Sequence, residues 1–419
     1  MSVGATDGND GKHTKGGIDY DRRNLIRGGS VVGYRSMDRG VILNEMKVDI
    51  VNDFKLGHRH RIDIVINSLE GGGAERVMVA LANEFAEQGE FVRLIALCRE
   101  GPYISEISDT VVFCCIHAKR ARAAVRSLAN LFRKDTPYVI LSSQWHVNIA
   151  TIVARTMSGI NPRLVIREGT TLGINKTGSI ARIQDILKRV PYRMADAIIA
   201  PSVGAAESLA NFAAVPRSLI YAIPNPVDVD HLQSKSKEVC GAIRHVRRKY
   251  IAALGRLSPE KGFDVLLRAF AGIVGRVDVD LIVTGDGQSK LELVELSRAL
   301  GIYDRVHFTG YIENPFPILA RSELFVLASR REGMPNALLQ ALALNIPVIA
   351  TDCPSGPREI LETLSCGRLV PVDDVGALCD AILLSLSECF STKTSDLIQM
   401  HFGSSQIAMR FRSIMLDLQ

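Results

Sequence analysis

The segment Ser329–Thr351 constrains the fold of this chain more than any other part of the sequence. An apolar run at 324–328 predicts a strand, and the polar loop after it carries Glu332. Pro335 is then expected to open a helix, because proline is favoured in the first helical turn, and leucines at helical spacing follow it. A second apolar run at 347–350 predicts another strand. This strand–loop–helix–strand unit indicates a parallel sheet, and it places a carboxylate and unpaired helix N–H groups at the edge where such sheets bind ligands.

The rest of the chain repeats this alternation, which predicts an α/β fold with two Rossmann-like, doubly wound domains facing a cleft. The strands expected in the first domain are 62–67, 91–97, 111–116, 138–141, 164–166, 197–200 and 219–223. The helices expected between them include 74–88, 119–134, 147–158 and 180–194. The strands expected in the second domain are 250–254, 280–284, 306–308, 324–328, 347–350 and 368–372, and its helices include 263–274 and 289–299.

A polar, charged stretch separates the two series, so we expect a first domain over residues 59–225 and a second over residues 226–403. The segment 1–58 lacks sustained apolar periodicity and mixes charges of both signs, which predicts a poorly ordered leader.

Composition excludes several classes of protein. A net charge of +5 over 419 residues is too weak to indicate a nucleic-acid partner. No apolar stretch approaches the ~20 residues that a membrane-spanning helix needs, and the start of the chain lacks the apolar core of a signal peptide. The eight cysteines form no C-x-x-C pair, as is typical of free thiols in a reducing compartment. We therefore expect a cytoplasmic protein whose contact with a membrane is at most peripheral.

The glycine-rich turn Gly71-Gly72-Gly73 follows the first strand of the first domain. Glycines let the backbone approach a ligand closely, and the helix expected to begin at Ala74 points its N-terminus at the same place. An anion such as a diphosphate would bind there, although the turn also fits an ordinary tight connection between strand and helix.

The loop after the first strand of the second domain carries Arg256 and Lys261, five residues apart. Two cations at a strand end can converge on a leaving diphosphate and stabilise its developing charge. The alternative is that both are solvated surface side chains.

Two Asp-x-Asp pairs resemble a metal-binding motif: Asp228-Val-Asp230 and Asp278-Val-Asp280. One lies between the domains and the other precedes a strand, so we interpret both as solvated loop carboxylates. No His/Cys grouping has zinc spacing either, and no metal site is expected.

The glycine-rich turn, the Arg256/Lys261 loop and the Glu332 segment occur in the order in which the retaining glycosyltransferases of family 4 carry them, and residues 61–419 resemble that family. The stretch 350–360 is similar to bacterial enzymes that assemble surface polysaccharides and lipid-linked oligosaccharides. The family's donor motif is a Glu, seven residues and a second Glu. Here the first is Glu332, but the second position holds Gln340.

The resemblance implies the GT-B architecture, with a helix over residues 404–419 that crosses back to the first domain. It also implies transfer of a sugar from a nucleoside-diphosphate donor, uridine-linked, with retention at the anomeric carbon and with neither a metal nor another cofactor. The catalytic residues it implies are Arg256, Lys261, Glu332 and Glu168. The substrate-binding residues it implies are Gly72, Gly73, Gly333, Met334, Asn336, Gln340 and His146.

Within that site, Glu332 would accept hydrogen bonds from the donor sugar, and N–H groups around Gly333 would meet the phosphate. Gln340 can accept from the ribose through its amide oxygen but brings no charge, so weaker donor binding is expected. Glu168 would lie near the reacting sugar and the acceptor. His146 stands at a neighbouring strand end and is either an acceptor-site residue or a structural cap.

No acidic residue occurs in the stretch 111–134, and its part 119–134 is basic. Val125, Leu128 and Phe132 share one helical stripe, while arginines occupy the other surfaces. Such a helix suits an anionic membrane surface, and it equally suits ordinary packing with a charged exposed face.

The function we predict is transfer of a sugar to a glycan or to a saccharide on a polyprenyl diphosphate, in surface polysaccharide biosynthesis. The rival is a non-catalytic subunit of the same fold that binds a sugar nucleotide or scaffolds an assembly complex, and Gln340 is the argument for it.

Overall fold

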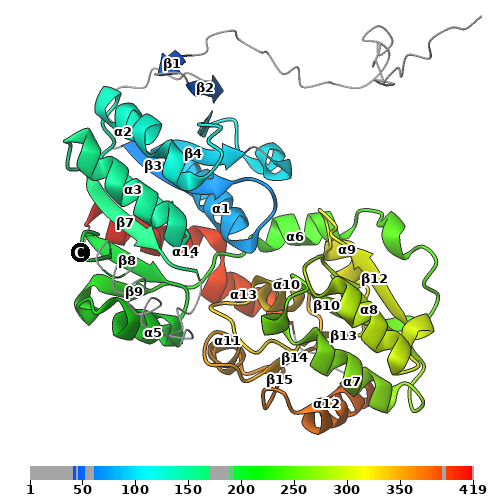
Figure 1. Cartoon of the computed structure of the whole chain (residues 1–419). Helices are drawn as coiled ribbons and strands as arrows, with labels where there is room; N and C mark the ends of the chain where they lie inside the picture. The colour runs from blue at the N-terminus through cyan, green and yellow to red at the C-terminus, as the bar shows by residue number, and fades with distance from the viewer. Residues whose placement is uncertain are drawn as a thin grey trace, which may run out of the picture. The chain divides into compact units, whose positions relative to one another are not determined.

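The computed structural model describes residues 41–43, 46–51, 61–99, 101–169, 189, 192–388 and 393–417. Its strands form two sheets, one in each half of this part of the chain, and helices lie alongside both (Figure 1). The predicted α/β fold with two Rossmann-like sheets is confirmed.

The first sheet has nine strands in the order β1-β2-β5-β4-β3-β6-β7-β8-β9. Pairing is parallel from β5 through β9, whereas β1 with β2 and β2 with β5 are antiparallel. The strands are Val41–Leu43 (β1), Met46–Val51 (β2), Arg61–Ser68 (β3), Phe91–Arg99 (β4), Val112–Cys115 (β5), Val139–Ser143 (β6), Arg163–Arg167 (β7), Ala197–Ala200 (β8) and Ile220–Ala222 (β9). The α-helices described between them are Gly73–Glu87 (α1), Val125–Lys134 (α2), Trp145–Ser158 (α3) and Val203–Ala213 (α5).

The second sheet has six strands, all parallel, in the order β12-β11-β10-β13-β14-β15. They are Lys249–Leu254 (β10), Val279–Thr284 (β11), Val306–Gly310 (β12), Leu324–Leu327 (β13), Val348–Thr351 (β14) and Arg368–Val370 (β15). The helices of this half are Val229–Ser236 (α6), Phe263–Ile273 (α7), Lys290–Ala299 (α8), Phe316–Ala320 (α9), Asn336–Ala343 (α10), Pro357–Leu364 (α11), Val375–Ser387 (α12) and Thr394–Phe402 (α13).

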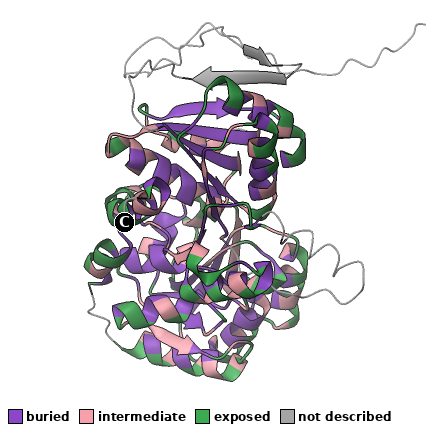
Figure 2. Ribbon diagram, turned by 90° about the vertical axis from the view of Figure 1, so that its left-hand side faces the viewer, coloured by how far each residue is buried: buried purple, intermediate pink, exposed green. Residues whose placement is uncertain are grey.

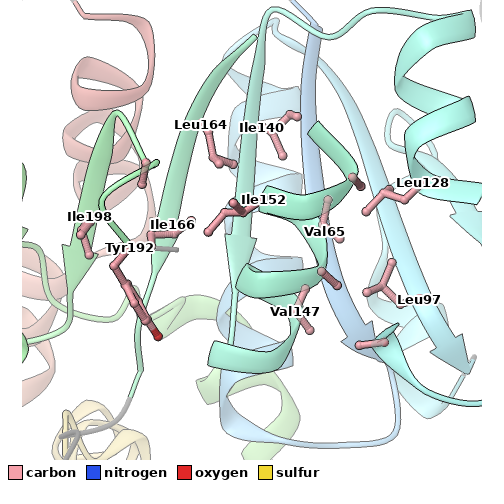
Figure 3. Close-up of a cluster of buried hydrophobic side chains, with 14 of the residues drawn as sticks. Val65, Leu97, Leu128, Ile140, Val147, Ile152, Leu164, Ile166, Tyr192 and Ile198 are labelled. Atoms are coloured by element: carbon pink, nitrogen blue, oxygen red, sulfur yellow. The ribbon is translucent and has the colours of Figure 1, made fainter. Parts of the chain in front are cut away.

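Both faces of each sheet are covered, as doubly wound sheets require. In β3, Val65 belongs to one apolar cluster, while Ile64 and Ile66 belong to the cluster on the opposite face. Figure 3 shows Val65 together with Val147 and Leu128 from the helices that cover its face. The strands are largely buried, and exposed residues gather on helices and loops (Figure 2).

The last described helix, α14 (Ser404–Leu416), packs with the first half of the chain although it follows the second. Its residues Ile407 and Phe411 join the cluster that contains Val77 of α1. The chain therefore passes between the halves twice. These crossings lie side by side, because the N–H of Val227 donates to the carbonyl of Phe402 at 2.8 Å and the N–H of Ser404 donates back to Val227 at 3.1 Å.

Three local predictions differ from the structure or lie outside it. Strands β1 and β2 fall within residues 1–58, for which we predicted a poorly ordered leader. Strand β2 pairs with β5 and β1 pairs with β2, and apolar periodicity does not signal such pairing. The helix expected over 119–134 is a 3₁₀ turn at Ala121–Ala124 followed by α2, and no residue that caps helices precedes it. Most of the helix expected over 180–194 lies outside the described residues.

The Asp-x-Asp pairs are only partly the solvated carboxylates that we expected. Asp228 caps α6 by accepting from the N–H of His231 at 2.9 Å, and Asp278 is 83% exposed. Asp280, however, is buried on β11 and bonds Arg305 at 2.7 Å and His307 at 2.9 Å. Although burial opposes it, the hydrogen bonds from these partners lower the pKa of Asp280, so it is a structural ion-pair residue.

Within the described part of the chain, no helix combines the length and apolarity needed to cross a bilayer. The seven cysteines found there are all free thiols, of which Cys114, Cys115 and Cys353 are buried.

Candidate functional site

The most closely organised group of predicted residues lies at the carboxyl end of β13. Glu332 is 9% exposed, and its Oε1 accepts from Lys261 Nζ and from Ser329 Oγ, both at 2.6 Å. Ser355 Oγ donates to the backbone carbonyl of Glu332 at 2.7 Å. The loop is thus fixed from both of its neighbouring strand ends, and a carboxylate and an ammonium are held as a pair.

The loop after β10 brings Lys261 to this place because the chain turns sharply at Gly262. Gly262 has φ +63°, and a Cβ there would lie 2.0 Å from the carbonyl oxygen of Ala328. Only glycine allows this approach. Arg256 is exposed on the same loop. Although partial burial opposes it, a hydrogen bond from Ser258 and the charges of Arg256 and Lys261 lower the pKa of Glu260, so the surroundings of this loop are cationic.

The helix after Glu332 begins one residue later than predicted. Asn336 is the first residue of α10, and Pro335 stands before it at the capping position, where the backbone is extended. Gly333 is required where it stands, because a Cβ would lie 2.4 Å from the carbonyl of Gly169 on the first half. Met334 is 8% exposed. The predicted phosphate-binding loop is therefore ordered and faces the first half of the chain.

The glycine-rich turn meets the same loop from the first half. Helix α1 begins at Gly73, one residue earlier than expected, and the Gly73 carbonyl accepts from Asn336 Nδ2 at 3.0 Å. A Cβ on Gly73 would lie 2.9 Å from that nitrogen. Gly72 lies against Glu75, which accepts from Gln144 Nε2 at 2.7 Å. The structure thus brings the first residues of α1 and α10 together.

Glu168 is more deeply buried than we predicted. It is 3% exposed, and its Oε2 accepts from the hydroxyl of Tyr192 at 2.7 Å. Burial and the adjacent carboxylate raise the pKa of Tyr192, so the phenol stays protonated and keeps donating. In this conformation Glu168 lies beneath the surface at the end of β7.

His146 lies in the first turn of α3, partly buried, with its ring centroid 5.9 Å from that of Trp145. The capping position of this helix is Gln144, so the interpretation of His146 as a cap is wrong. Burial lowers the pKa of His146 against the opposing charge of Glu75, which favours the neutral imidazole.

Gln340 is apart from the Lys261–Glu332 pair. It is 9% exposed, one helical turn beyond Asn336, and it lines a pocket of about 120 Å³. The pocket lies between α1, α6, α9 and α10, and its polar lining comprises Arg76, Asn83, Glu106, Asp228, His231, Asn336 and Gln340.

Sequence reasoning missed Arg167 and Asn225, which are buried where the halves meet. Arg167 donates to Asn225 Oδ1 at 2.6 Å, and Asn225 donates to Asn336 Oδ1 at 2.6 Å. The only signal in the sequence was the position of Asn225 between Pro224 and Pro226, which restricts the backbone on both sides.

Glu359 was also missed as a contact between the halves. Its carboxylate accepts from the N–H of Val203 at 2.8 Å and from that of Gly204 at 3.0 Å, so a residue of α11 caps α5. In the described residues no three His, Cys, Asp or Glu side chains cluster as a metal site would require.

Comparison with known proteins identifies the family. Residues 71–231 match the family model described as "Glycosyltransferase Family 4", and residues 248–388 match the one described as "Glycosyl transferases group 1". The chain is a glycosyltransferase with a family 4 domain and a group 1 domain. The two matches correspond to the two sheets of this transferase, and the resemblance drawn from its motifs is confirmed.

Similar proteins agree with this assignment. The transferase is 29% identical over 344 residues to the N-acetylgalactosamine-N,N'-diacetylbacillosaminyl-diphospho-undecaprenol 4-alpha-N-acetylgalactosaminyltransferase of Campylobacter jejuni, covering 78% of this chain and 90% of that one. A second C. jejuni enzyme, a GalNAc-alpha-(1->4)-GalNAc-alpha-(1->3)-diNAcBac-PP-undecaprenol alpha-1,4-N-acetyl-D-galactosaminyltransferase, is 25% identical over 78% of this chain and 89% of its own.

Among solved structures, Anabaena Alr3699/HepE in complex with UDP and glucose superposes with a TM-score of 0.71 at 17% identity, over 86% of this chain and all of that one. At this identity the likeness establishes the fold, that of GT-B glycosyltransferases. Both relatives above are named as sugar transferases, so this chain is an enzyme as well. The alternative of a non-catalytic subunit is not favoured.

Proposed function

We propose that this transferase moves a sugar from a uridine-diphosphate donor to a saccharide carried on a lipid diphosphate, with retention at the anomeric carbon. The observation that carries the proposal is the Lys261–Glu332 pair, held at 2.6 Å at the carboxyl end of β13 and beside the first residues of α10. A carboxylate for sugar hydroxyls and an ammonium for phosphate stand side by side there. The acceptor class is supported by the C. jejuni relative, whose name specifies a diphospho-undecaprenol saccharide.

In the proposed site, Arg256 and Lys261 contact the diphosphate, and the N–H groups around Gly333 and Met334 add hydrogen bonds to it. Glu332 accepts from the donor sugar. The glycine-rich turn at Gly72 approaches the diphosphate from the other half, where the N-terminus of α1 favours an anion.

The transfer step we propose takes place on one face of the sugar. The bond between the anomeric carbon and the diphosphate oxygen breaks, and a bond to the acceptor oxygen forms on the same face. The acceptor proton passes to the departing phosphate oxygen, so the charge that Arg256 and Lys261 stabilise is largest as that bond breaks. Every role in this step belongs to the side chains and the substrates, and we propose no metal or other cofactor.

The acceptor would approach from the first half of the chain. Glu168 follows β7 and precedes Gly169, whose carbonyl lies against Gly333. His146 lies at the start of α3, where the charge of Glu75 acts on it. A neutral His146 can donate to or accept from a saccharide hydroxyl. Glu168 would contact substrate only after the Tyr192 hydroxyl releases it, so we propose that Glu168 holds Tyr192 and the strand end before the acceptor binds.

The assay that tests the proposed function uses the purified full chain with a panel of nucleoside-diphosphate sugars and a synthetic polyprenyl-diphosphate disaccharide. Extension of the lipid-linked saccharide by one sugar, with the new linkage in the donor's anomeric configuration by NMR, is the expected result. Inverted configuration would overturn the proposed mechanism. Absence of any product with every donor would overturn the proposed substrates.

Gln340→Glu is expected to tighten UDP binding. Gln340 lines the pocket next to Asn336, where we propose that the ribose lies, and a carboxylate accepts from ribose hydroxyls with charge assistance. The gain should be at most ~1–2 kcal/mol, because some hydrogen bonding to the amide oxygen already exists. Titration calorimetry with UDP measures it. Gln340→Ala removes the amide and should weaken UDP binding. Tighter UDP binding by this alanine variant would show that the ribose does not lie next to residue 340.

We also propose that the basic surface formed by the 3₁₀ turn and α2 holds the enzyme at an anionic membrane, on the cytoplasmic face where its lipid-linked acceptor would be reached. Its exposed cations are Lys119, Arg120, Arg122, Arg126, Arg133 and Lys134. Arg133 is left out of the test, because its guanidinium donates hydrogen bonds to the carbonyls of Met157 and Ser158 at the end of α3.

Arg122→Glu/Arg126→Glu is therefore the variant expected to release the protein from vesicles containing anionic lipid. Each cation contributes ~1 kcal/mol at such a surface, so removing two should lower partitioning at least ~30-fold. Flotation at two salt concentrations measures it. Arg244→Glu/Arg247→Glu is the control: it changes the net charge by the same amount on exposed residues of the second half. Its partitioning onto the vesicles should equal that of the parent protein. Equal loss in both double variants would indicate a nonspecific charge effect.

A further inference from the structure

The contacts of Asn225 form a continuous path through the place where the two halves meet. Arg167 Nη2 donates to Asn225 Oδ1 at 2.6 Å, and Asn225 Nδ2 donates to Asn336 Oδ1 at 2.6 Å and to the Met334 carbonyl at 3.3 Å. Asn336 Nδ2 then donates to the carbonyl of Gly73 at 3.0 Å. Arg167 and Asn225 are 2% and 4% exposed.

The direction of this path is fixed at both ends. A guanidinium can only donate, and a peptide carbonyl can only accept, so Arg167 and Gly73 leave each amide between them a single orientation. Burial lowers the pKa of Arg167 to about 10, against the charges of Glu168 and Glu75, and at neutral pH it remains a cation and a donor. Arg167 is itself anchored, because its Nη1 donates to Ser143 Oγ at 3.2 Å.

The path reaches backbone segments of the proposed donor site in both halves of the chain. Met334 lies in the loop after Glu332, Asn336 is the first residue of α10, and Gly73 is the first residue of α1. Asn225 stands two residues before Val227, where the two chain crossings pair. Asn336 bonds the first residue of α1 directly, and Asn225 holds the Asn336 amide in the orientation that this bond needs.

We propose that Arg167, Asn225 and Asn336 form a one-directional chain of hydrogen bonds that positions the donor loop 332–336 against the glycine-rich turn. Asn225 is its central positioning residue. This inference rests on the proposed function, since it concerns the site that would hold the donor diphosphate. With the chain intact, N–H groups at the starts of α1 and α10 converge on one anion. When the chain is broken, each helix keeps its own N–H groups but loses its fixed partner.

The test is calorimetry with UDP on the full chain, together with steady-state kinetics. Asn225→Asp keeps the acceptor for Arg167 and removes both donated bonds, and Asn225→Ala removes all three without adding charge. Each should weaken UDP binding on the order of 10-fold or more, because the donor loop loses the hydrogen bonds that hold it against the glycine-rich turn. The donor KM should rise by a similar factor while kcat changes less than about threefold, as expected when binding common to ground and transition states is lost.

Asn336→Ala tests the same chain at a partly exposed residue, where folding is at less risk. The double variant Asn225→Ala/Asn336→Ala should bind UDP within about threefold of the weaker single variant, because both changes break one chain. Asp280→Asn is the control: it removes a charge from a buried cluster with Arg305 and His307. It should lower the melting temperature and leave UDP binding at the parent value.

Parent-like UDP binding by Asn225→Ala would overturn the inference, as would weakening by Asn225→Asp alone, which would indicate repulsion between charges. Independent, multiplicative effects in the double variant would overturn it as well. Failure of the parent itself to bind any nucleoside diphosphate is a separate outcome, because it would overturn the proposed function and with it the inference.

Discussion

Lys261→Ala and Arg256→Ala are each expected to lower turnover by ~10²–10³-fold, the loss typical of removing one stabiliser of developing charge. Lys261 Nζ lies 2.6 Å from Glu332 in a partly buried position, and Arg256 lies exposed on the same loop. If both meet the leaving diphosphate, their charge matters most as the bond to the sugar breaks. Turnover at saturating donor should therefore fall more than UDP affinity does.

Lys249→Ala is the matched control for these two variants. Lys249 stands at the opposite end of strand β10 and pairs with Glu323 in an exposed position at 3.1 Å. Exposed pairs of this kind contribute little, so turnover and melting temperature should stay close to the parent values. Near-parent turnover in both Lys261→Ala and Arg256→Ala would remove these cations from the mechanism.

The order and type of the elements after residue 60 were largely predictable, because most of the strands there are buried apolar runs. The strand predicted at 62–67 is Arg61–Ser68, and the one predicted at 250–254 is Lys249–Leu254. Buried parallel strands carry this signal within five or six residues of sequence. The site loops followed from the same reasoning, since a polar residue directly after such a strand must lie at the carboxyl edge of the sheet.

The features that were missed all depend on partners far away in the sequence. Asp280 was interpreted as solvated because its partners, Arg305 and His307, lie beyond helix α8 and reach it through the pairing of β11 with β12. Glu359 meets the N-terminus of α5 more than 150 residues earlier in the chain. Local periodicity contains no information on such contacts, because they arise only when sheets and loops take their final places.

Burial of Glu168 has the same origin. The sequence placed it correctly at the end of a strand, but its exposure is set by Tyr192, whose hydroxyl lies 2.7 Å away. A strand end predicts that a side chain reaches the edge of the sheet. Whether the side chain then faces solvent or another side chain depends on packing, and here Glu168 faces the hydroxyl of Tyr192.

Glu332→Ala is expected to lower transfer by at least ~10²-fold while leaving UDP binding within a few-fold of the parent, because Glu332 is proposed to contact the sugar and not the nucleotide. The change also leaves Lys261 and the Ser329 hydroxyl without the oxygen that each contacts at 2.6 Å. Affinity for the UDP-sugar should fall toward that for UDP alone. Calorimetry with both ligands and single-turnover measurement of lipid-linked product provide the comparison.

Two further variants separate the contributions of Glu332. Glu332→Gln keeps the shape and can still accept one hydrogen bond, but it lacks the charge that pairs with Lys261, so its activity should lie between those of parent and alanine variant. Glu323→Ala removes a carboxylate just before the same strand, at the opposite end of β13, and should leave transfer unchanged. If Glu332→Ala instead weakened UDP and UDP-sugar binding equally, Glu332 would act by holding Lys261 at the diphosphate. The proposed contact between Glu332 and the sugar would then be wrong.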